Sequence, residues 1–414
     1  MKIAMLSTGE EVLHGDIVDT NAAWLSSLFY QHGFGLTKRS TVGDKQSSLI
    51  EEFLMLSFNN DVVIVNGGLG PTTDDMSAAA AAKAAAKAAE CKLVLFKEWL
   101  EQLESMYARR GIPMPDSNLK QAMLPEIAEI LDNPIGTACG FKMLINDAIF
   151  YFTPGVPSEF KLMAETQILP DLRRVFPDVK GSCCSRIYTF GLSESGISDK
   201  LDQLKLPQGY ELGYRSYLPF IEVKLFGPAD QLEQRLKLMQ LINKHLESNT
   251  VSIDLPMVEH VGQLLADKDL TLSVSEKSSA GYLTYWLNSD ENVEKQLGHG
   301  WVLAGRNQTV NHEGDPLVAT FALAGATREK CATDLALVTG QVEGGVFSVA
   351  LSTPSGEWGA SYKLAKKYQR DDQVKVISTA ALDLLRRYLG RKPMFAHYAF
   401  LEKVKEMHIP NSAL

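Results

Sequence analysis

Three segments of this chain combine glycine with carboxylate and amide side chains. They run from Thr8 to Asn21 (TGEEVLHGDIVDTN), from Asn66 to Asp75 (NGGLGPTTDD) and from Pro154 to Glu159 (PGVPSE). Glycine lets the backbone approach a ligand closely, and it lets consecutive N–H groups point inward, which suits phosphate oxygens. The three segments therefore predict a site for a phosphate-bearing small molecule.

The same segments carry acids that would repel a phosphate unless a cation lay between the charges. These acids are Glu10, Asp19, Asp74, Asp75 and Glu159. Hard divalent ions prefer oxygen ligands and share them with substrate phosphates. We therefore expect a divalent metal, Mg²⁺, Mn²⁺ or Co²⁺, as the cofactor.

Each acid also has a structural explanation. Asp19 could cap the helix that follows it. Asp74 or Asp75 could cap the alanine-rich segment 77–90, although one cap leaves the second acid unexplained. Glu159 could lie in the first turn of a helix, where its charge suits the helix dipole. One such segment is weak evidence, whereas three together favour a binding site.

Apolar strands should position these segments. The runs 2–7, 61–66 and 148–153 each end where a glycine-rich segment begins, and the second is continuous and β-branched, as buried parallel strands tend to be. The alanine-rich segment 77–90 favours a helix on the outside of the sheet. Strands alternating with helices predict a three-layer α/β domain over residues 1–170, built on a parallel, doubly wound sheet. Ligands bind at the carboxyl ends of such strands.

Changes in composition near residues 170 and 253 divide the rest of the 414-residue chain. The block between them predicts a small α+β connector. An apolar strand at 270–274 then begins a second α/β block. We expect three domains, 1–170, 171–253 and 254–414, the last ending in a mostly helical tail from Gly390.

Composition limits the partners and the compartment. The net charge of −9 gives no global attraction to nucleic acid or to an anionic membrane. No run approaches the ~20 apolar residues of a membrane-spanning helix. The five cysteines are scattered without CxxC spacing, which fits a reducing compartment. We expect a cytoplasmic protein with a small-molecule nucleotide substrate and with neither a nucleic-acid nor a membrane partner.

The three glycine-rich segments resemble the signature turns of the CinA family. Further matches are NLKQA at 118–122 and NPIGTA at 133–138, and the middle block is similar to the family's KH-like or ferredoxin-like linker. The similarity covers essentially the whole chain and is most specific over residues 1–165. It implies a molybdopterin-binding-protein-like fold for the first domain and a homodimer.

The resemblance also implies a metal-dependent nucleotide pyrophosphatase that cleaves ADP-ribose to AMP and ribose 5-phosphate. The metal would neutralise charge on the diphosphate and lower the pKa of a bound water. The implied catalytic residues are Asp75, Glu159 and Glu10, and the implied metal ligands are Asp19, Asp74, Asp75 and Glu159. The implied substrate-binding residues are Asn21, Asn66, Gly67, Gly68, Gly70, Thr72, Thr73, Asn118, Gly136 and Gly155.

The C-terminal block departs from the family's second activity, the deamidation of nicotinamide mononucleotide (NMN). The family motif Ala-Glu-Ser-Cys-Thr-Gly-Gly corresponds here to SEKSSAG at 275–281. Lys277 therefore takes the place of the nucleophile-type serine, although Ser278 and Ser279 are adjacent.

Two further motifs of that activity are also altered. Of Tyr-Ser-Asn-x-x-Lys only Asn307 remains, and Val310 replaces the lysine that would activate a serine. The third motif is shortened to TGQVEGG at 339–345. A hydroxyl nucleophile needs an adjacent base, and only Arg306 or His299 could substitute for it. We expect a C-terminal domain without activity.

Two alternatives to the pyrophosphatase remain open at this point. The first domain could bind a nucleotide or molybdopterin without turnover, which would give tight ligand retention and no metal-dependent cleavage. The C-terminal domain could also retain residual NMN amidohydrolase activity.

Overall fold

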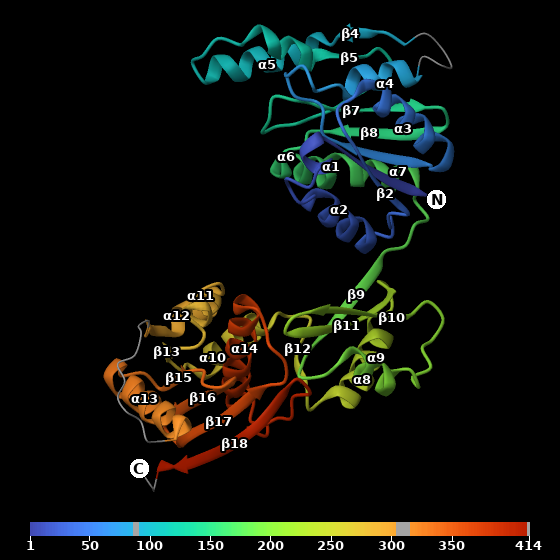
Figure 1. The fold of residues 1–414 in the computed structure, drawn as a ribbon. Helices are drawn as coiled ribbons and strands as arrows, with labels where there is room; N and C mark the ends of the chain where they lie inside the picture. Colours follow the sequence, from blue (N-terminus) through green and yellow to red (C-terminus); the bar gives the residue numbers. More distant parts are fainter. Residues whose placement is uncertain (86–90, 304–314, 412–414) are drawn as a thin grey trace. The chain divides into compact units, whose positions relative to one another are not determined.

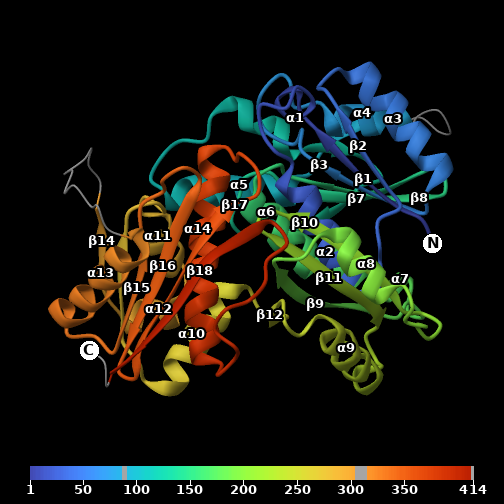
Figure 2. The same ribbon diagram turned by 60° about the horizontal axis from the view of Figure 1, so that its bottom comes forward.

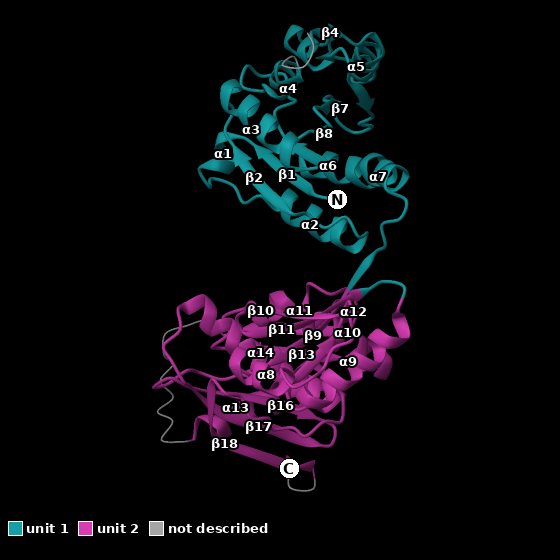
Figure 3. Ribbon diagram, turned by 90° about the vertical axis from the view of Figure 1, so that its right-hand side faces the viewer, with its two compact units in different colours: residues 1–183, 228–230 teal, residues 184–227, 231–414 magenta. Residues whose placement is uncertain are grey.

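The computed structural model describes residues 1–85, 91–303 and 315–411. The chain forms two compact units, residues 1–183 with 228–230 and residues 184–227 with 231–414 (Figures 1 and 3). Among the described residues, no helix is both long and apolar enough to cross a membrane.

The first unit is built on a six-stranded sheet with the order β2-β1-β3-β8-β7-β6. Its strands are β1 (Ile3–Thr8), β2 (Lys38–Val42), β3 (Val62–Asn66), β6 (Glu129–Leu131), β7 (Gly140–Ile145) and β8 (Ala148–Thr153). Its main helices are α1 (Glu10–Leu13), α2 (Thr20–Gln31), α3 (Gln46–Asn59), α4 (Ser77–Ala85), α6 (Pro157–Met163) and α7 (Leu169–Val175). A smaller lobe holds β4 (Leu93–Leu95), β5 (Met123–Pro125), α5 (Lys97–Arg109) and the 3₁₀ segment η1 (Asp116–Ala122).

Alternating side chains make this unit three layers thick, as the sequence predicts. Val63 and Val65 of β3 pack with α3 and α4, whereas Val62 and Ile64 pack with α2 and α6 on the other face. This alternation follows from the two-residue repeat of a strand, and both faces are covered by helices (Figure 1).

The prediction of a parallel sheet is correct for β2, β1, β3 and β8 and wrong for β7. The strands β2, β1, β3 and β8 are parallel, but β7 runs antiparallel to β8, and β6 runs antiparallel to β7. Only Asn146 and Asp147 separate β7 from β8, and Asn146 has a φ of 51°. A two-residue turn with left-handed backbone joins antiparallel strands and leaves no room for a crossover helix.

The second unit contains two sheets. A four-stranded sheet, β10-β11-β9-β12, carries the helices α8 (Glu194–Leu201) and α9 (Leu232–Leu246). Its strands are β9 (Ser182–Phe190), β10 (Glu211–Tyr217), β11 (Phe220–Pro228) and β12 (Thr250–Ile253). The division into three domains at residues 170 and 253 stays a prediction.

The six-stranded sheet of this unit has the order β14-β13-β15-β16-β17-β18. Its strands are β13 (Leu272–Glu276), β14 (Leu297–Val302), β15 (Leu335–Thr339), β16 (Val346–Thr353), β17 (Gly356–Leu364) and β18 (Leu401–Pro410). Its helices are α10 (Met257–Lys268), α11 (Tyr282–Leu287), α12 (Glu291–Gln296), α13 (Pro316–Cys331) and α14 (Arg370–Leu389). The sheet lies between α13 and α14 (Figure 2).

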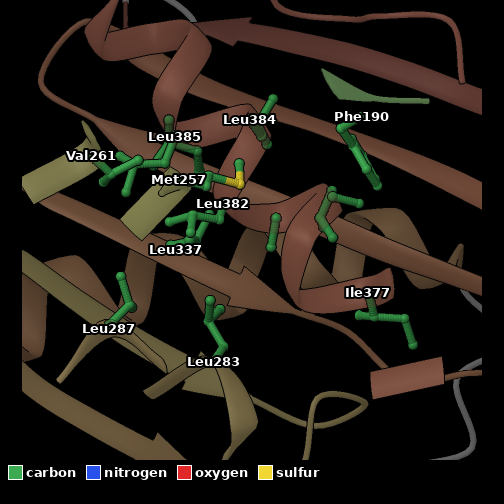
Figure 4. Close-up of a cluster of buried hydrophobic side chains, with 14 of the residues drawn as sticks. Phe190, Met257, Val261, Leu283, Leu287, Leu337, Ile377, Leu382, Leu384 and Leu385 are labelled. Atoms are coloured by element: carbon green, nitrogen blue, oxygen red, sulfur yellow. The ribbon is translucent and has the colours of Figure 1, made fainter. Parts of the chain in front are cut away.

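The two sheets of the second unit share one hydrophobic core. Leu382, Leu384 and Leu385 of α14 pack there with Leu337 of β15 (Figure 4). Phe190, which ends β9 of the four-stranded sheet, belongs to the same buried cluster. This shared core accounts for the two sheets forming one compact unit.

The prediction of a helical tail is wrong. Residues Leu401–Pro410 form the edge strand β18, which pairs antiparallel with β17. Leu401, Val404 and Met407 are three residues apart, and that spacing resembles one helix face. In the structure these residues share no face: Val404 is exposed beside the register shift at Ser361, and Leu401 and Met407 pack into clusters on opposite sides of the sheet.

Candidate active site

A cleft of about 400 Å³ opens at the carboxyl ends of β1, β3 and β8. Its walls come from the backbone after each strand, Thr8–Gly9, Gly67–Pro71 and Pro154–Val156. The three strands are adjacent and parallel, so their carboxyl ends meet at one edge of the sheet. The second wall is also the richest in glycine.

Glycine is required at the tightest part of this cleft. Gly67 has a φ of +110°, and a Cβ there would lie 2.6 Å from Oγ1 of Thr8. Gly68 has a φ of +71°, and its Cβ would lie 2.3 Å from Oγ of Ser77. Side chains are therefore excluded by backbone conformation and by space, and the backbone itself lines the cleft.

Two buried amides hold the strand ends together. The Asn66 amide donates to the carbonyl of Pro154 at 2.6 Å and to Thr153 Oγ1 at 3.3 Å. The Asn21 amide donates to Asn66 Oδ1 and to the carbonyl of Gly155, both at 2.9 Å. Both side chains lie behind the cleft wall and position the backbone that forms it.

The paired acids after the glycine loop have different surroundings. The Asp75 carboxylate accepts from the Thr72 N–H at 2.9 Å and from the Thr72 hydroxyl, so it closes the loop on itself. Lys120 donates to the carbonyl of Thr72 on the other side. Asp74 is exposed, and the Thr72 hydroxyl and, more weakly, the Lys120 charge lower the pKa of its carboxyl. Both acids line the cleft.

Glu159 reaches the cleft from the first turn of α6 and is held by an amide. Asn133 donates to Glu159 Oε2 at 2.8 Å and to the carbonyl of Ala138 at 2.7 Å. A Cβ on Gly136 would lie 2.2 Å from the same Oε2, so glycine leaves room for the carboxylate. The segment 133–138 therefore positions Glu159.

Two acids of the cleft are absent from the sequence prediction. Asp44 and Glu11 both line it. Burial raises the pKa of Asp44, and the negative charges of Glu11, Asp74 and Glu10 raise it further. Asp44 follows the strand β2, whose sequence KRSTV is polar because it is an edge strand. If this strand had been recognised in the sequence, Asp44 would have been a candidate, because it follows the strand as the other candidate acids follow theirs.

Several predicted residues lie outside the cleft lining. Asp19 accepts from the Ala22 N–H at 2.9 Å as the cap of α2, and from Ser7 Oγ at 2.6 Å. Oε2 of Glu10 lies 3.6 Å from Nε2 of His14. Asn118 donates to Gln121 Oε1 at 2.7 Å, and it is Gln121 that lines the cleft. Thr72 and Thr73 are exposed at the loop tip.

The carboxylates that line the cleft suit a cation that is also bound by a ligand's phosphate. Within residues 1–85, 91–303 and 315–411, no group of three or more His, Cys, Asp or Glu is arranged to hold a metal ion alone. Mg²⁺ is usually held by one or two carboxylates together with substrate phosphates and waters. Asp74 and Asp44 offer such carboxylates beside the glycine wall. The residues therefore fit a metal that arrives with a phosphate, and they do not form a complete metal cage.

The altered motif of the second unit is tightly folded. Glu276 is buried and accepts from the N–H groups of Gly281, Leu283 and Thr284 at 2.7–3.1 Å. Lys277 is exposed, and Ser279 Oγ lies 2.7 Å from Thr339 Oγ1. His299 is exposed on β14. Arg306, Asn307 and Val310 lie outside the described residues.

The fold and the cleft define an α/β protein with a molybdopterin-binding-like first domain. Residues 4–174 match the family model described as a probable molybdopterin binding domain. The chain is 39% identical over 412 residues to a CinA-like protein of Escherichia coli (strain SMS-3-5 / SECEC), covering 98% of this chain and 99% of that protein. The chain therefore belongs to the CinA family.

The chain is also similar to a second curated relative and to a solved structure. The NMN amidohydrolase-like protein YfaY of Escherichia coli (strain K12) is 38% identical over 98% of this chain and 99% of its own length. A crystal structure of CinA from Thermoplasma acidophilum is 27% identical and covers 40% of this chain and 95% of that chain, with a TM-score of 0.37.

Proposed function

We propose that the cleft of the first unit hydrolyses the diphosphate linkage of a nucleotide, with a divalent cation. ADP-ribose is the substrate that we propose, and addition of water across its P–O–P linkage gives AMP and ribose 5-phosphate. The observation that carries the proposal is the gathering of Glu11, Asp44, Asp74, Asp75 and Glu159 beside a glycine wall. Structural caps alone do not require five acids in one cleft.

The glycine wall supports binding of the diphosphate. Within the described residues, the N–H groups of Gly68, Leu69 and Gly70 donate no hydrogen bond to other backbone atoms, and all three residues line the cleft. Consecutive free N–H groups form an anion-binding concavity. They recognise phosphate oxygens and leave the base and the sugar to other contacts.

We propose different roles for the carboxylates of the cleft. Asp74 and Asp44 would hold the cation, which neutralises the diphosphate charge and activates a water when bound. Asp75 keeps the loop closed through Thr72. Glu159, which accepts a hydrogen bond from Asn133, would orient the attacking water and take its proton.

The test is AMP release from ADP-ribose by the purified chain with Mg²⁺, Mn²⁺ or Co²⁺, and with a chelator. We expect release only with a metal, and a loss of at least about 100-fold in Asp74→Asn, because a ligand of the cation is removed. Asp147→Asn is the matched control, since Asp147 is exposed in the β7–β8 turn at the opposite end of β8. Absence of AMP with all three metals from a folded protein would contradict the proposal.

Binding without turnover is the second candidate, and the match to a probable molybdopterin binding domain favours it. It predicts that a nucleotide or a molybdopterin copurifies with the protein and stays intact with every metal. The homodimer expected from the resemblance also remains a prediction.

We further propose that the second unit lacks the activity named in its NMN amidohydrolase-like relative. Lys277 replaces the nucleophile-type serine, so the hydroxyl that the family motif supplies is missing at that position. Incubation of the full chain with NMN should release no ammonia above a no-enzyme blank. Stoichiometric ammonia release that grows with enzyme concentration would overturn this assignment.

A further inference from the structure

A second cavity lies wholly within the second unit and is lined by an excess of cationic side chains. Its volume is about 760 Å³, in the range of small-molecule sites. The lining comes from residues 191–200, 244–249 and 386–399. We propose that this cavity binds a phosphate-bearing small molecule of mononucleotide size, independently of the cleft in the first unit.

Hydrogen bonds between distant segments hold the cavity walls in place. The Asn249 amide donates to the carbonyls of Phe190 at 3.0 Å and His397 at 3.2 Å. The Ala399 N–H donates to the carbonyl of Gly191 at 2.8 Å, and Arg387 donates to the carbonyl of Ser248 at 2.7 Å. The three lining segments are therefore joined to one another, so the cavity has a defined shape.

The charges around this cavity do not balance. Its lining holds five cationic side chains, Lys200, Lys244, Arg386, Arg387 and Lys392, and a single carboxylate, Glu247. Lys392 pairs with Glu247 at 3.3 Å. Lys200 and Lys244 form no ion pair within the part of the chain that the structure describes. A local positive excess in a chain with a net charge of −9 favours an anionic ligand at this place.

The buried layer beneath the cavity adds to this excess. Asp383 is buried and accepts from Arg386 Nε at 2.8 Å and from Arg387 Nε at 2.7 Å. Both guanidinium side chains are only 5% exposed. Two buried positive charges thus face one buried negative charge, and an uncompensated buried charge is costly. A phosphate in the cavity would compensate it.

An apolar wall completes the site. Leu192, Pro393 and Phe395 line the cavity together with the cations. Small-molecule sites commonly combine apolar and aromatic walls with a few polar groups that fix orientation. A phosphate group beside the cations and a ring against the Phe395 side would use both kinds of wall, which is the chemistry of a mononucleotide.

Calorimetric titration of the full chain tests this proposal, with AMP, inorganic phosphate and adenosine as probes. The buffer contains a chelator, because a phosphate cannot then use a divalent cation to bind the acidic cleft of the first unit. We expect saturable AMP binding that weakens with added salt. The affinity for AMP should exceed the affinity for phosphate and the affinity for adenosine by at least about 10-fold.

The double variant Lys200→Gln, Lys244→Gln should weaken AMP binding by at least about 10-fold, since it removes two charges next to the phosphate. Lys268→Gln with Lys295→Gln is the matched control, because both lysines are exposed in the same unit and lie outside the cavity lining. Both double variants should have the melting temperature of the wild type and should release AMP from ADP-ribose at the wild-type rate.

Absence of saturable AMP binding in the wild type would overturn the proposal, and so would equal affinities in the two double variants. AMP binding no tighter than phosphate binding would overturn the role of the apolar wall and hence the mononucleotide assignment. These outcomes do not depend on turnover in the first unit, because the titration uses no metal and no ADP-ribose.

Discussion

At the scale of single residues, the acids of the first unit perform different tasks although they look alike in the sequence. Asp19 caps α2, Asp75 closes a loop, and Glu159 is held by Asn133. Asp74 is the acid of the glycine loop that is exposed to solvent, and it lines the cleft. The hydrogen-bond partners of a carboxylate therefore indicate its role better than its position in a motif.

Asp75→Asn tests the loop-closing role of Asp75. Both Thr72 donors bond to the same oxygen, Oδ2, and a neutral amide oxygen accepts them less strongly than a carboxylate does. We therefore expect the Thr72 loop to loosen and turnover of ADP-ribose to fall by at least about 10-fold. The fold should persist, because Asp75 is only partly buried. Steady-state AMP release and circular dichroism would measure both properties. Full activity in Asp75→Asn would contradict its place in the site, and Asp147→Asn again serves as the control.

At the scale of elements, one carboxylate of α7 bonds to two strands of the sheet, in addition to the apolar packing of Leu169 and Leu172. Asp171 of α7 accepts from Lys142 of β7 at 2.8 Å and from the Tyr151 hydroxyl of β8 at 2.7 Å, and it pairs with Arg174 at 2.5 Å. Burial alone would raise the pKa of Asp171, but these hydrogen bonds outweigh it and lower the pKa to about 2. The helix is thus attached through a charged group.

The pH dependence of stability should report this attachment. Because the folded pKa lies below the unfolded value near 3.8, Asp171 stabilises the fold above about pH 4 and loses that contribution as the pH falls towards 2. The full shift corresponds to about 2 kcal/mol, reduced by solvent screening. In urea titrations, Asp171→Asn should lower the free energy of unfolding most at neutral pH, and the difference from the wild type should shrink towards pH 2. A difference that stays constant with pH would exclude this role, and exposed Asp178→Asn is the control.

At the scale of the whole molecule, the two proposed sites lie in different compact units. The proposed hydrolysis belongs to the first unit, and the basic cavity belongs to the second. Within the second unit, Phe190 joins the four-stranded sheet to the core of the six-stranded sheet. We therefore expect the two sheets to unfold together.

Phe190→Ala should destabilise the second unit by about 3–5 kcal/mol, because Phe190 is 1% exposed and its removal leaves a cavity. Differential scanning calorimetry should show one transition moved to lower temperature, with the transition of the first unit unchanged. Phe58→Ala is the control, because Phe58 is 73% exposed in the first unit. Separate melting of the two sheets in the wild type would contradict the shared core.

The sequence by itself determined the local features of the candidate site. The strands β1, β3 and β8 were predicted to within about a residue, because continuous apolar runs are local signals of buried strands. The sequence also identified Gly67 and Gly68, because they follow an apolar strand directly, and the structure shows that their backbone conformations exclude other residues. Family membership followed from the same segments.

Only the tertiary structure decided which side chains share the cleft. Asp44 enters from the polar edge strand β2, while Asp19 turns away to cap α2. The antiparallel β7 and the tail strand β18 likewise depend on pairing between distant segments. The sequence records residue types and their spacing, whereas strand pairing, side-chain direction and the gathering of charge arise from contacts between residues far apart in the chain.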